Sequence, residues 1–270
     1  MNKYYTYTMR RGLDSVKLIV SNLKSKTWLV PDFICDEVLD VIKEHVADVQ
    51  FYHVKDDFDL ECKLEADPNK EYVIYTVDYF GSEQAELQVS DKTIVVRDSV
   101  WFHIPVRGVK SNEIWFNSYR KILHAEGFKG SLIISPIPLY DMGMLQTIYP
   151  DEVSSSVIRL MWFHDELKAR VKNLQCLTLE LSQLAVMRQF QFPSVFPIRL
   201  KDRDHVLSQL DFKFPGMWKN KYNLDNKLYS ELVLIPLDSR YSPADLTQLA
   251  SNIKKLHATE PIRDNPSSSG

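Results

Sequence analysis

The chain has 270 residues, of which 44% are hydrophobic and 11% aromatic, and its formal net charge is −3. This composition is typical of a globular protein with a sizeable core and excludes a disordered chain. Neither sign of charge forms a long run, so we expect no nucleic acid or membrane partner. No apolar segment approaches about 18 residues, and the first residues (MNKYYTYTMRRGLD) lack the apolar run of a signal peptide.

The three cysteines, Cys35, Cys62 and Cys176, are odd in number and far apart in the sequence. This pattern argues against a disulfide framework and against a cysteine-based zinc site. It suits a reducing compartment. We therefore expect a cytoplasmic protein without a metal site.

Helical and strand-like patterns alternate in the first half of the chain. Apolar spacings of three and four residues predict one helix that begins near Gly12 and another over Cys35–His45. Short apolar runs predict strands over 27–31, 49–54, 72–77, 93–96, 113–116 and 131–134. Residues 1–10 show no clear period, and residues 55–70 read as a surface connection. Such alternation predicts an α/β fold with a mainly parallel sheet.

The pattern changes after Ser135. A long helical pattern runs from about 153 to 184, followed by a strand-like run over 196–200, a short helix and a strand over 232–237. The last helix should begin at Ser242-Pro243, because serine caps helix N-termini and proline fits the first helical position. We expect a large domain over 1–150 and a smaller α/β domain over 151–270, with a disordered tail from about 260.

Polar residues follow two neighbouring predicted strands. Asp98 comes after the first of these strands, and Ser118 and Lys121 come after the second. In an open α/β sheet, such residues line the ligand crevice. Pyridoxal phosphate (PLP) needs a lysine, an acid at its ring nitrogen and donors for its phosphate, so this trio suits it. Acids and serines are also ordinary loop residues, so a different kind of α/β protein stays open.

Gly12 lies just before the first predicted helix. A helix N-terminus offers free N–H groups and a positive dipole end to a phosphate. An ordinary loop glycine is the alternative interpretation of this residue.

Six segments in a characteristic order carry a resemblance that covers the chain from about 11 to 256. They are RGLDSV (11–16), LVPDFIC (29–35), VDYFG (77–81), VVRD (95–98), SYRK (118–121) and LIPLDSRYSPADLTQLASNIKKL (234–256). Together these segments resemble the motifs of the DegT/DnrJ/StrS-type sugar aminotransferases, which are PLP enzymes of fold type I. The resemblance implies a PLP-transferase fold and a homodimer whose two subunits complete each other's active sites.

The resemblance also assigns catalytic roles. Lys121 would form the Schiff base with PLP and then act as the general base, and Asp98 would pair with the pyridine nitrogen. The implied reaction transfers an amino group from a donor such as glutamate to a nucleotide-linked keto sugar. It would belong to sugar or polysaccharide biosynthesis. The dehydratase branch of the family fits less well, because it carries histidine where this chain has Lys121.

Further residues are expected to bind the cofactor. Ser118, Gly12 and Leu13 lie at the positions that hold the phosphate in the family. Trp101 stands where glutamine or histidine is typical and could stack on the ring. His103 could support Asp98 or a cofactor oxygen, and a core histidine without such a role is the alternative.

Departures from the family pattern leave a second hypothesis open. Arg11 and Leu13 replace side chains that usually donate to the phosphate, and Cys35 stands where an aromatic ring commonly stacks on the pyridine. Arg97 replaces the acidic neighbour of Asp98. The segment that precedes the phosphate turn in the family is also expected to be missing. The chain could therefore be a family member that has lost turnover and serves as a binding or partner subunit, although the retained trio favours an enzyme.

Overall fold

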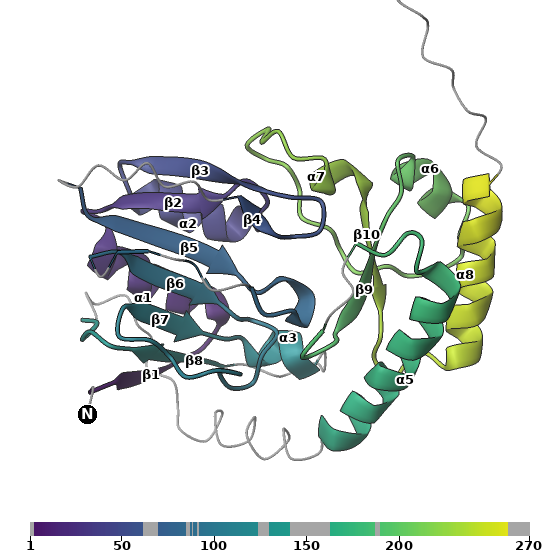
Figure 1. Cartoon of the computed structure of the whole chain (residues 1–270), viewed down its shortest axis with the longest axis horizontal. Coiled ribbons are helices and arrows are strands. Elements are labelled where there is room, and N and C mark those ends of the chain that lie inside the picture. Colours follow the sequence, from purple (N-terminus) through teal and green to yellow (C-terminus); the bar gives the residue numbers. More distant parts are fainter. Residues whose placement is uncertain are drawn as a thin grey trace, which may run out of the picture.

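The computed structural model describes residues 3–61, 70–84, 87, 89–90, 92–123, 130–140, 163–186 and 190–258. Its elements form two parts that lie side by side, a large sheet with helices and a small sheet with helices (Figure 1). The predicted α/β class is confirmed. The predicted boundary near residue 150, the start of the predicted helix at 153–162 and the expected tail all lie outside the described residues.

Eight strands form the large sheet in the order β1-β8-β7-β6-β5-β2-β3-β4. The strands are β1 (Tyr5–Met9), β2 (Thr27–Pro31), β3 (Val49–Val54), β4 (Leu60–Glu61), β5 (Tyr72–Val77), β6 (Ile94–Asp98), β7 (Glu113–Phe116) and β8 (Ser131–Ser135). The central run from β3 to β7 is parallel, whereas β1, β8 and β4 pair antiparallel with their neighbours. The mainly parallel sheet is thus confirmed.

Two strands were not predicted. In β1, tyrosine and threonine alternate at an edge of the sheet, and neither residue gives the apolar alternation that marks a strand. The strand β4 has only two residues and lies within the segment that was read as a surface connection.

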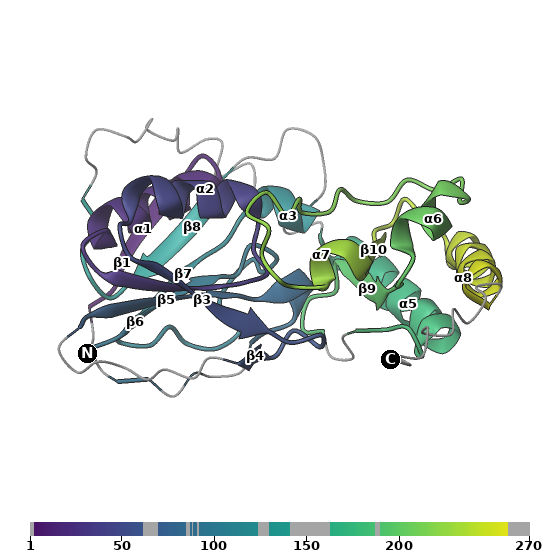
Figure 2. The ribbon, with the colours of Figure 1, turned by 90° about the horizontal axis from the view of Figure 1, so that it is seen from above.

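Three helices lie on one side of the large sheet, namely α1 (Gly12–Leu23), α2 (Asp36–His45) and α3 (Tyr119–Leu123) (Figure 2). In α1, the buried side chains of Val16, Ile19, Val20 and Leu23 recur at helical spacing, as the sequence predicts. A single 3₁₀ turn, η1 (Tyr79–Gly81), follows β5.

Gly81, the last residue of η1, contacts the second half of the chain through its backbone. Its φ is +91°, and a Cβ there would lie 1.7 Å from the carbonyl oxygen of Phe192. The carbonyl oxygen of Gly81 accepts hydrogen bonds from the backbone N–H groups of Gln191 and Phe192, at 3.1 and 2.9 Å. Only glycine fits such a conformation at such a close approach.

The smaller part contains the antiparallel pair β9 (Val195–Arg199) and β10 (Leu232–Pro236). Its helices are α5 (Phe163–Leu181), α6 (Arg203–Ser208), α7 (Leu228–Glu231) and α8 (Pro243–Ala258). The predicted start of α8 is confirmed, since Ser242 and Asp245 each accept a hydrogen bond from the other's backbone N–H, at 3.2 and 2.9 Å. No helix in the described part of the chain is long and apolar enough to cross a membrane.

The two parts share β10. Leu232 and Leu234 belong to the core under the large sheet, whereas Val233 and Ile235 belong to the core between β9, β10, α5 and α8. Since successive side chains of a strand point to opposite faces, β10 contributes one face to each core. This explains its uninterrupted apolar sequence.

Candidate active site

Asp98 is the last residue of β6, at the carboxyl end of the parallel strands, and its side chain is buried. Its Oδ2 accepts a hydrogen bond from the hydroxyl of Tyr75 at 2.6 Å, and its Oδ1 accepts one from the backbone N–H of Val100 at 3.3 Å. Burial raises the pKa of the Asp98 carboxyl to about 7, and these two hydrogen bonds oppose part of the rise. The site thus holds a carboxylate poised between its charged and neutral forms.

Lys121 lies on α3, which follows β7 directly, so that its side chain reaches the same end of the sheet as Asp98. Its Nζ lies 5.5 Å from the ring centroid of Trp101. Burial lowers the pKa of the Lys121 ammonium, and the neighbouring Arg120 lowers it further, whereas the charge of Asp98 raises it. A lysine in this environment is more readily deprotonated than one in water.

The helix α3 is anchored by a buried arginine of the smaller part. Arg170, on α5, is fully buried and donates from Nη2 to the carbonyl oxygen of Ile122 at 2.8 Å. It also forms an ion pair with Glu166 at 2.7 Å and donates to Ser194 Oγ at 3.2 Å. The helix that carries Lys121 is therefore fixed against α5.

Gly12 and Ser118 meet at the N-termini of α1 and α3. A Cβ on Gly12 would lie 3.1 Å from Ser118 Cβ and 3.4 Å from Ser118 Oγ. The two segments are tied together nearby, because Ser15 Oγ and Ser131 Oγ are hydrogen-bonded at 2.6 Å and Gly130 donates its N–H to the carbonyl oxygen of Arg10 at 2.7 Å. Because Gly12 has no Cβ, Ser118 can approach the N-terminus of α1 closely, where the first N–H groups of a helix lack partners within the helix.

The two residues that flank Gly12 behave differently. Leu13 is partly buried and packs against the core under the large sheet. The Arg11 guanidinium binds the Asp14 carboxylate at 3.1 and 3.3 Å and is largely exposed. The structure therefore pairs Arg11 with a residue of its own helix.

Trp101 and His103 both lie in the loop after β6. Trp101 is buried, and its ring lies 6.3 Å from that of Phe80. The His103 ring packs against the ring of Phe192 with centroids 4.8 Å apart, and burial lowers the pKa of its imidazole. Its buried Nδ1 has no hydrogen-bond partner among the described residues. Among the described residues, the hydrogen bonds that Asp98 accepts come from Tyr75 and Val100 and not from His103.

Cys35 lies at the N-cap of α2 and is partly buried. Burial raises the pKa of its thiol, while the backbone N–H groups of Glu37 and Val38 and the charge of Lys121 oppose this rise. The aromatic side chains near this position come from elsewhere. Phe33 packs against Trp218 at 4.8 Å and against Tyr229 at 4.9 Å.

Two contributors to the site region were missed in the sequence. Tyr75 lies in the middle of β5, where every residue is buried, so no alternation singles it out. Trp218 belongs to the irregular segment between α6 and α7. Lys221 in the same segment binds the Asp40 carboxylate of α2 at 2.7 Å and holds the segment against the large sheet's helices. No motif in the sequence signals this contact.

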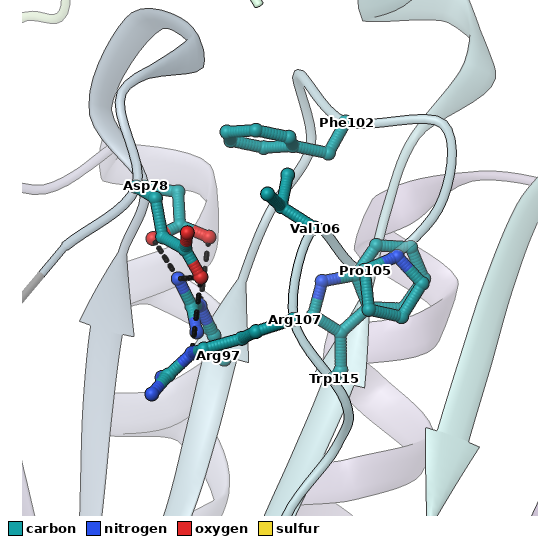
Figure 3. Close-up of a pocket in the computed structure, with 8 residues that line it drawn as sticks. Asp78, Arg97, Phe102, Pro105, Val106, Arg107 and Trp115 are labelled. Carbon is teal, nitrogen blue, oxygen red and sulfur yellow. Dashed lines mark hydrogen bonds and ion pairs between the residues drawn. The ribbon is translucent and has the colours of Figure 1, made fainter. Parts of the chain in front are cut away.

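Arg97 points to the face of β6 opposite to Asp98, because consecutive strand residues alternate. There it binds Asp78 at 2.8 Å (Figure 3). It also binds Glu83 at 2.8 Å, and Arg107 binds Glu83 at 3.0 Å. These charged side chains line a small hollow under the loop that follows Trp101. The arginine that replaces an acidic neighbour of Asp98 is thus used in a buried ionic network.

No protein-family model and no curated protein matches the sequence. Solved structures do match. A DegT DnrJ EryC1 StrS aminotransferase from Brucella abortus has a TM-score of 0.64 at 15% identity over 94% of this chain and 86% of its own. PseC from Helicobacter pylori, an aminotransferase involved in the biosynthesis of pseudoaminic acid, gives 0.64 at 10% identity over 95% and 87%. A NifS-like protein from Rickettsia africae gives 0.68 at 13% identity over 95% and 82%.

These matches show the fold. It is that of the fold-type I PLP-dependent aminotransferases, as the sequence motifs imply. The DegT/DnrJ/StrS group that those motifs resemble is represented among the matching structures, so the likeness in sequence and the likeness in fold agree. Identities of 10–15% leave the substrate open.

The residues present fit PLP. Gly12 lets the Ser118 hydroxyl lie close to the N-terminus of α1, so that a hydroxyl donor and helix N–H groups could bind one phosphate. Asp98 is a buried carboxylate that a cationic ring nitrogen would neutralise, and Lys121 is a half-buried amine on the adjacent element. The ion pair between Arg11 and Asp14 places an acidic side chain in the same first turn, which weakens the attraction for a phosphate.

Proposed function

We propose that this protein is a PLP-dependent aminotransferase that transfers an amino group to a nucleotide-linked keto sugar. The observation that carries the proposal is the convergence of Asp98, Lys121 and the contact between Gly12 and Ser118 at one end of the sheet. The amino group would leave a donor such as glutamate, which becomes the keto acid, and would end on the carbonyl carbon of the sugar. The likeness to PseC, an aminotransferase of pseudoaminic acid biosynthesis, supports a sugar substrate.

Each residue would act through a property described above. A bound PLP supplies a ring that accepts the electron pair left when a proton is removed from the carbon beside the amino group. Lys121 Nζ, whose pKa is lowered by burial, would hold the cofactor covalently and move that proton. Asp98, as the anion, would keep the ring nitrogen protonated. Ser118 and the first N–H groups of α1 would bind the phosphate, and Trp101 would cover the ring and exclude water.

Cofactor loading tests this function. The protein is mixed with PLP, treated with borohydride and digested, and the modified peptide is identified by mass spectrometry. We expect the modification on Lys121 and its loss in Lys121→Ala. The exposed Lys172 on α5 provides the matched control, since Lys172→Ala should load normally. A folded protein that carries no modification in excess PLP would rule out the enzyme.

Substrate class requires a separate measurement. With glutamate as the donor, amino products are sought by mass spectrometry across nucleotide-linked keto sugars and, for comparison, simple keto acids. Turnover limited to keto acids would refute the sugar part of the proposal and leave the aminotransferase part intact.

The alternative is a protein of this fold that acts as a binding or partner subunit without turnover. The pairing of Arg11 with Asp14 favours it, because this pair leaves fewer donors for a phosphate at the start of α1. Failure to load PLP together with tight binding of a keto sugar would select this alternative.

We further propose a homodimer located in the cytoplasm. A homodimer would allow the second subunit to complete the site, as the resemblance implies. Sedimentation equilibrium gives the mass of the particle directly. A mass of one chain at micromolar concentration would refute the dimer.

A further inference from the structure

The hydroxyl of Tyr75 faces the carboxylate of Asp98 inside the sheet. The two oxygen atoms are 2.6 Å apart, and both side chains are buried. Burial and the charge of Asp98 raise the pKa of the Tyr75 phenol well above its ordinary value. The phenol therefore keeps its proton and acts as the donor, while the carboxylate accepts.

Tyr75 is held so that its hydroxyl has little freedom to turn away. It occupies the centre of β5, which pairs with β2 and β6 on its two sides. Its carbonyl oxygen accepts a hydrogen bond from the Tyr52 hydroxyl at 2.8 Å. Its ring stacks on Trp28 and packs against Phe116, with centroids 6.4 Å away in both cases. The donor is thus fixed before any ligand arrives.

Other charged side chains near Asp98 change how readily it ionises, but they do not donate a hydrogen bond to its carboxylate. Lys121, on α3, favours the anion by its positive charge, and Asp78, after β5, disfavours it. Asp78 is itself neutralised by its ion pair with Arg97 at 2.8 Å. Among the described residues, Tyr75 is the side chain that donates a hydrogen bond to Asp98, in addition to one weaker backbone donor.

We propose that Tyr75 is the positioning residue that keeps Asp98 ionised and oriented toward the cationic ring nitrogen of the cofactor. The part that concerns the cofactor rests on the proposed function. The part that concerns Asp98 holds for the protein alone, because the hydrogen bond exists without a ligand. A donor to a carboxylate stabilises the anion relative to the neutral acid.

The titration of Asp98 in the apoprotein tests this role. The aspartate carboxyl carbons are labelled with ¹³C, and the Asp98 signal is assigned by its absence in Asp98→Asn. A charge-assisted hydrogen bond is equivalent to about one to two pH units, so Tyr75→Phe should raise the midpoint by that amount. Tyr79→Phe is the matched control, since it removes an equally buried hydroxyl that bonds to the carbonyl oxygen of Phe33.

PLP binding at pH 7, followed by the quenching of tryptophan fluorescence, provides the second readout. If the Asp98 midpoint rises by one unit from about 7, the ionised fraction at pH 7 falls from one half to one tenth. The apparent dissociation constant should then rise about fivefold in Tyr75→Phe. This loss should shrink as the pH is raised, which a general loosening of the fold would not produce.

The outcomes separate the two proposals. An Asp98 midpoint that is the same in Tyr75→Phe as in the unmodified protein overturns the role of Tyr75, whether or not PLP binds. A raised midpoint in a protein that never takes up PLP supports the role of Tyr75 and refutes the proposed function. If Tyr75→Phe does not fold, 3-fluorotyrosine at position 75 replaces it. Its more acidic phenol is a stronger donor, so the midpoint should fall, and an unchanged midpoint refutes the proposal.

Discussion

Replacing Asp98 by asparagine should make the protein more stable at neutral and alkaline pH while removing its acid for the cofactor. The pKa of this carboxyl is raised from 3.8 to about 7 by burial. Between these two values the folded protein keeps the proton that the unfolded chain has lost, so the free energy of unfolding falls as the pH rises. Above about pH 7 both states are ionised and the loss is complete.

The size of the effect follows from this gap. The full gap of about three pH units corresponds to about 4 kcal/mol at 1.36 kcal/mol per unit. Between pH 5 and pH 8 the unmodified protein should lose about 2 to 3 kcal/mol through Asp98 alone. The side chain introduced by Asp98→Asn does not titrate, and its amide oxygen can still accept a hydrogen bond from Tyr75.

Urea unfolding of the apoprotein at pH 5 and pH 8 measures this difference. The stability of Asp98→Asn relative to the unmodified protein should increase by about 2 to 3 kcal/mol between the two pH values. Asp165→Asn serves as the control, since that side chain is 93% exposed. Its stability relative to the unmodified protein should be the same at pH 5 and pH 8. A difference for Asp98→Asn that is the same at both pH values would refute the reasoning that burial controls this carboxyl.

Three further substitutions probe the contacts around the site. Gly12→Val should weaken PLP binding at least tenfold, because the added side chain would collide with Ser118, as measured by fluorescence titration, whereas Gly216→Val, with open space around it, should not. Gly81→Ala should lower the free energy of unfolding by more than about 2 kcal/mol in urea, because its positive φ and close backbone contact exclude a Cβ; an effect within about 0.5 kcal/mol would contradict this. Arg170→Met should lower the free energy of unfolding by about 3 kcal/mol, because it leaves the buried partners of Arg170 unpaired. An unchanged free energy in the same urea assay would show that water replaces the arginine as their hydrogen-bond partner.

The core of the site follows from the sequence because its geometry is a property of parallel strands. Asp98 and Lys121 follow neighbouring runs of buried apolar residues, and parallel strands bring their carboxyl ends to one edge. Gly12 and Ser118 were expected near each other only from the family resemblance, since the strand β1 that leads to Gly12 was not predicted. The helices and central strands could be predicted to within a few residues, because apolar residues on a buried face recur at the spacing of the helix or strand.

What the sequence did not reveal depends on contacts between side chains that lie far apart in the sequence. Tyr75 lies in a strand that is buried on both faces, so its neighbours give no hint that its hydroxyl meets Asp98. Nor did the sequence reveal the partner of Arg11, because the helical spacing that brings Asp14 within its reach is shared by many pairs that do not bind each other. Trp218 reaches Phe33 through an irregular segment, where no periodicity guides a prediction.

The sharing of β10 between two cores has a consequence for synthesis on the ribosome. The strands of the large sheet are complete at residue 135, yet its core also needs Phe192, Val195, Leu228, Tyr229, Leu232 and Leu234. At about 5–20 residues per second, translation of the roughly 100 intervening residues takes about 5 to 20 seconds. During that interval the nascent sheet carries uncovered apolar surface, and chaperones that bind such surface have time to act before the chain can close it.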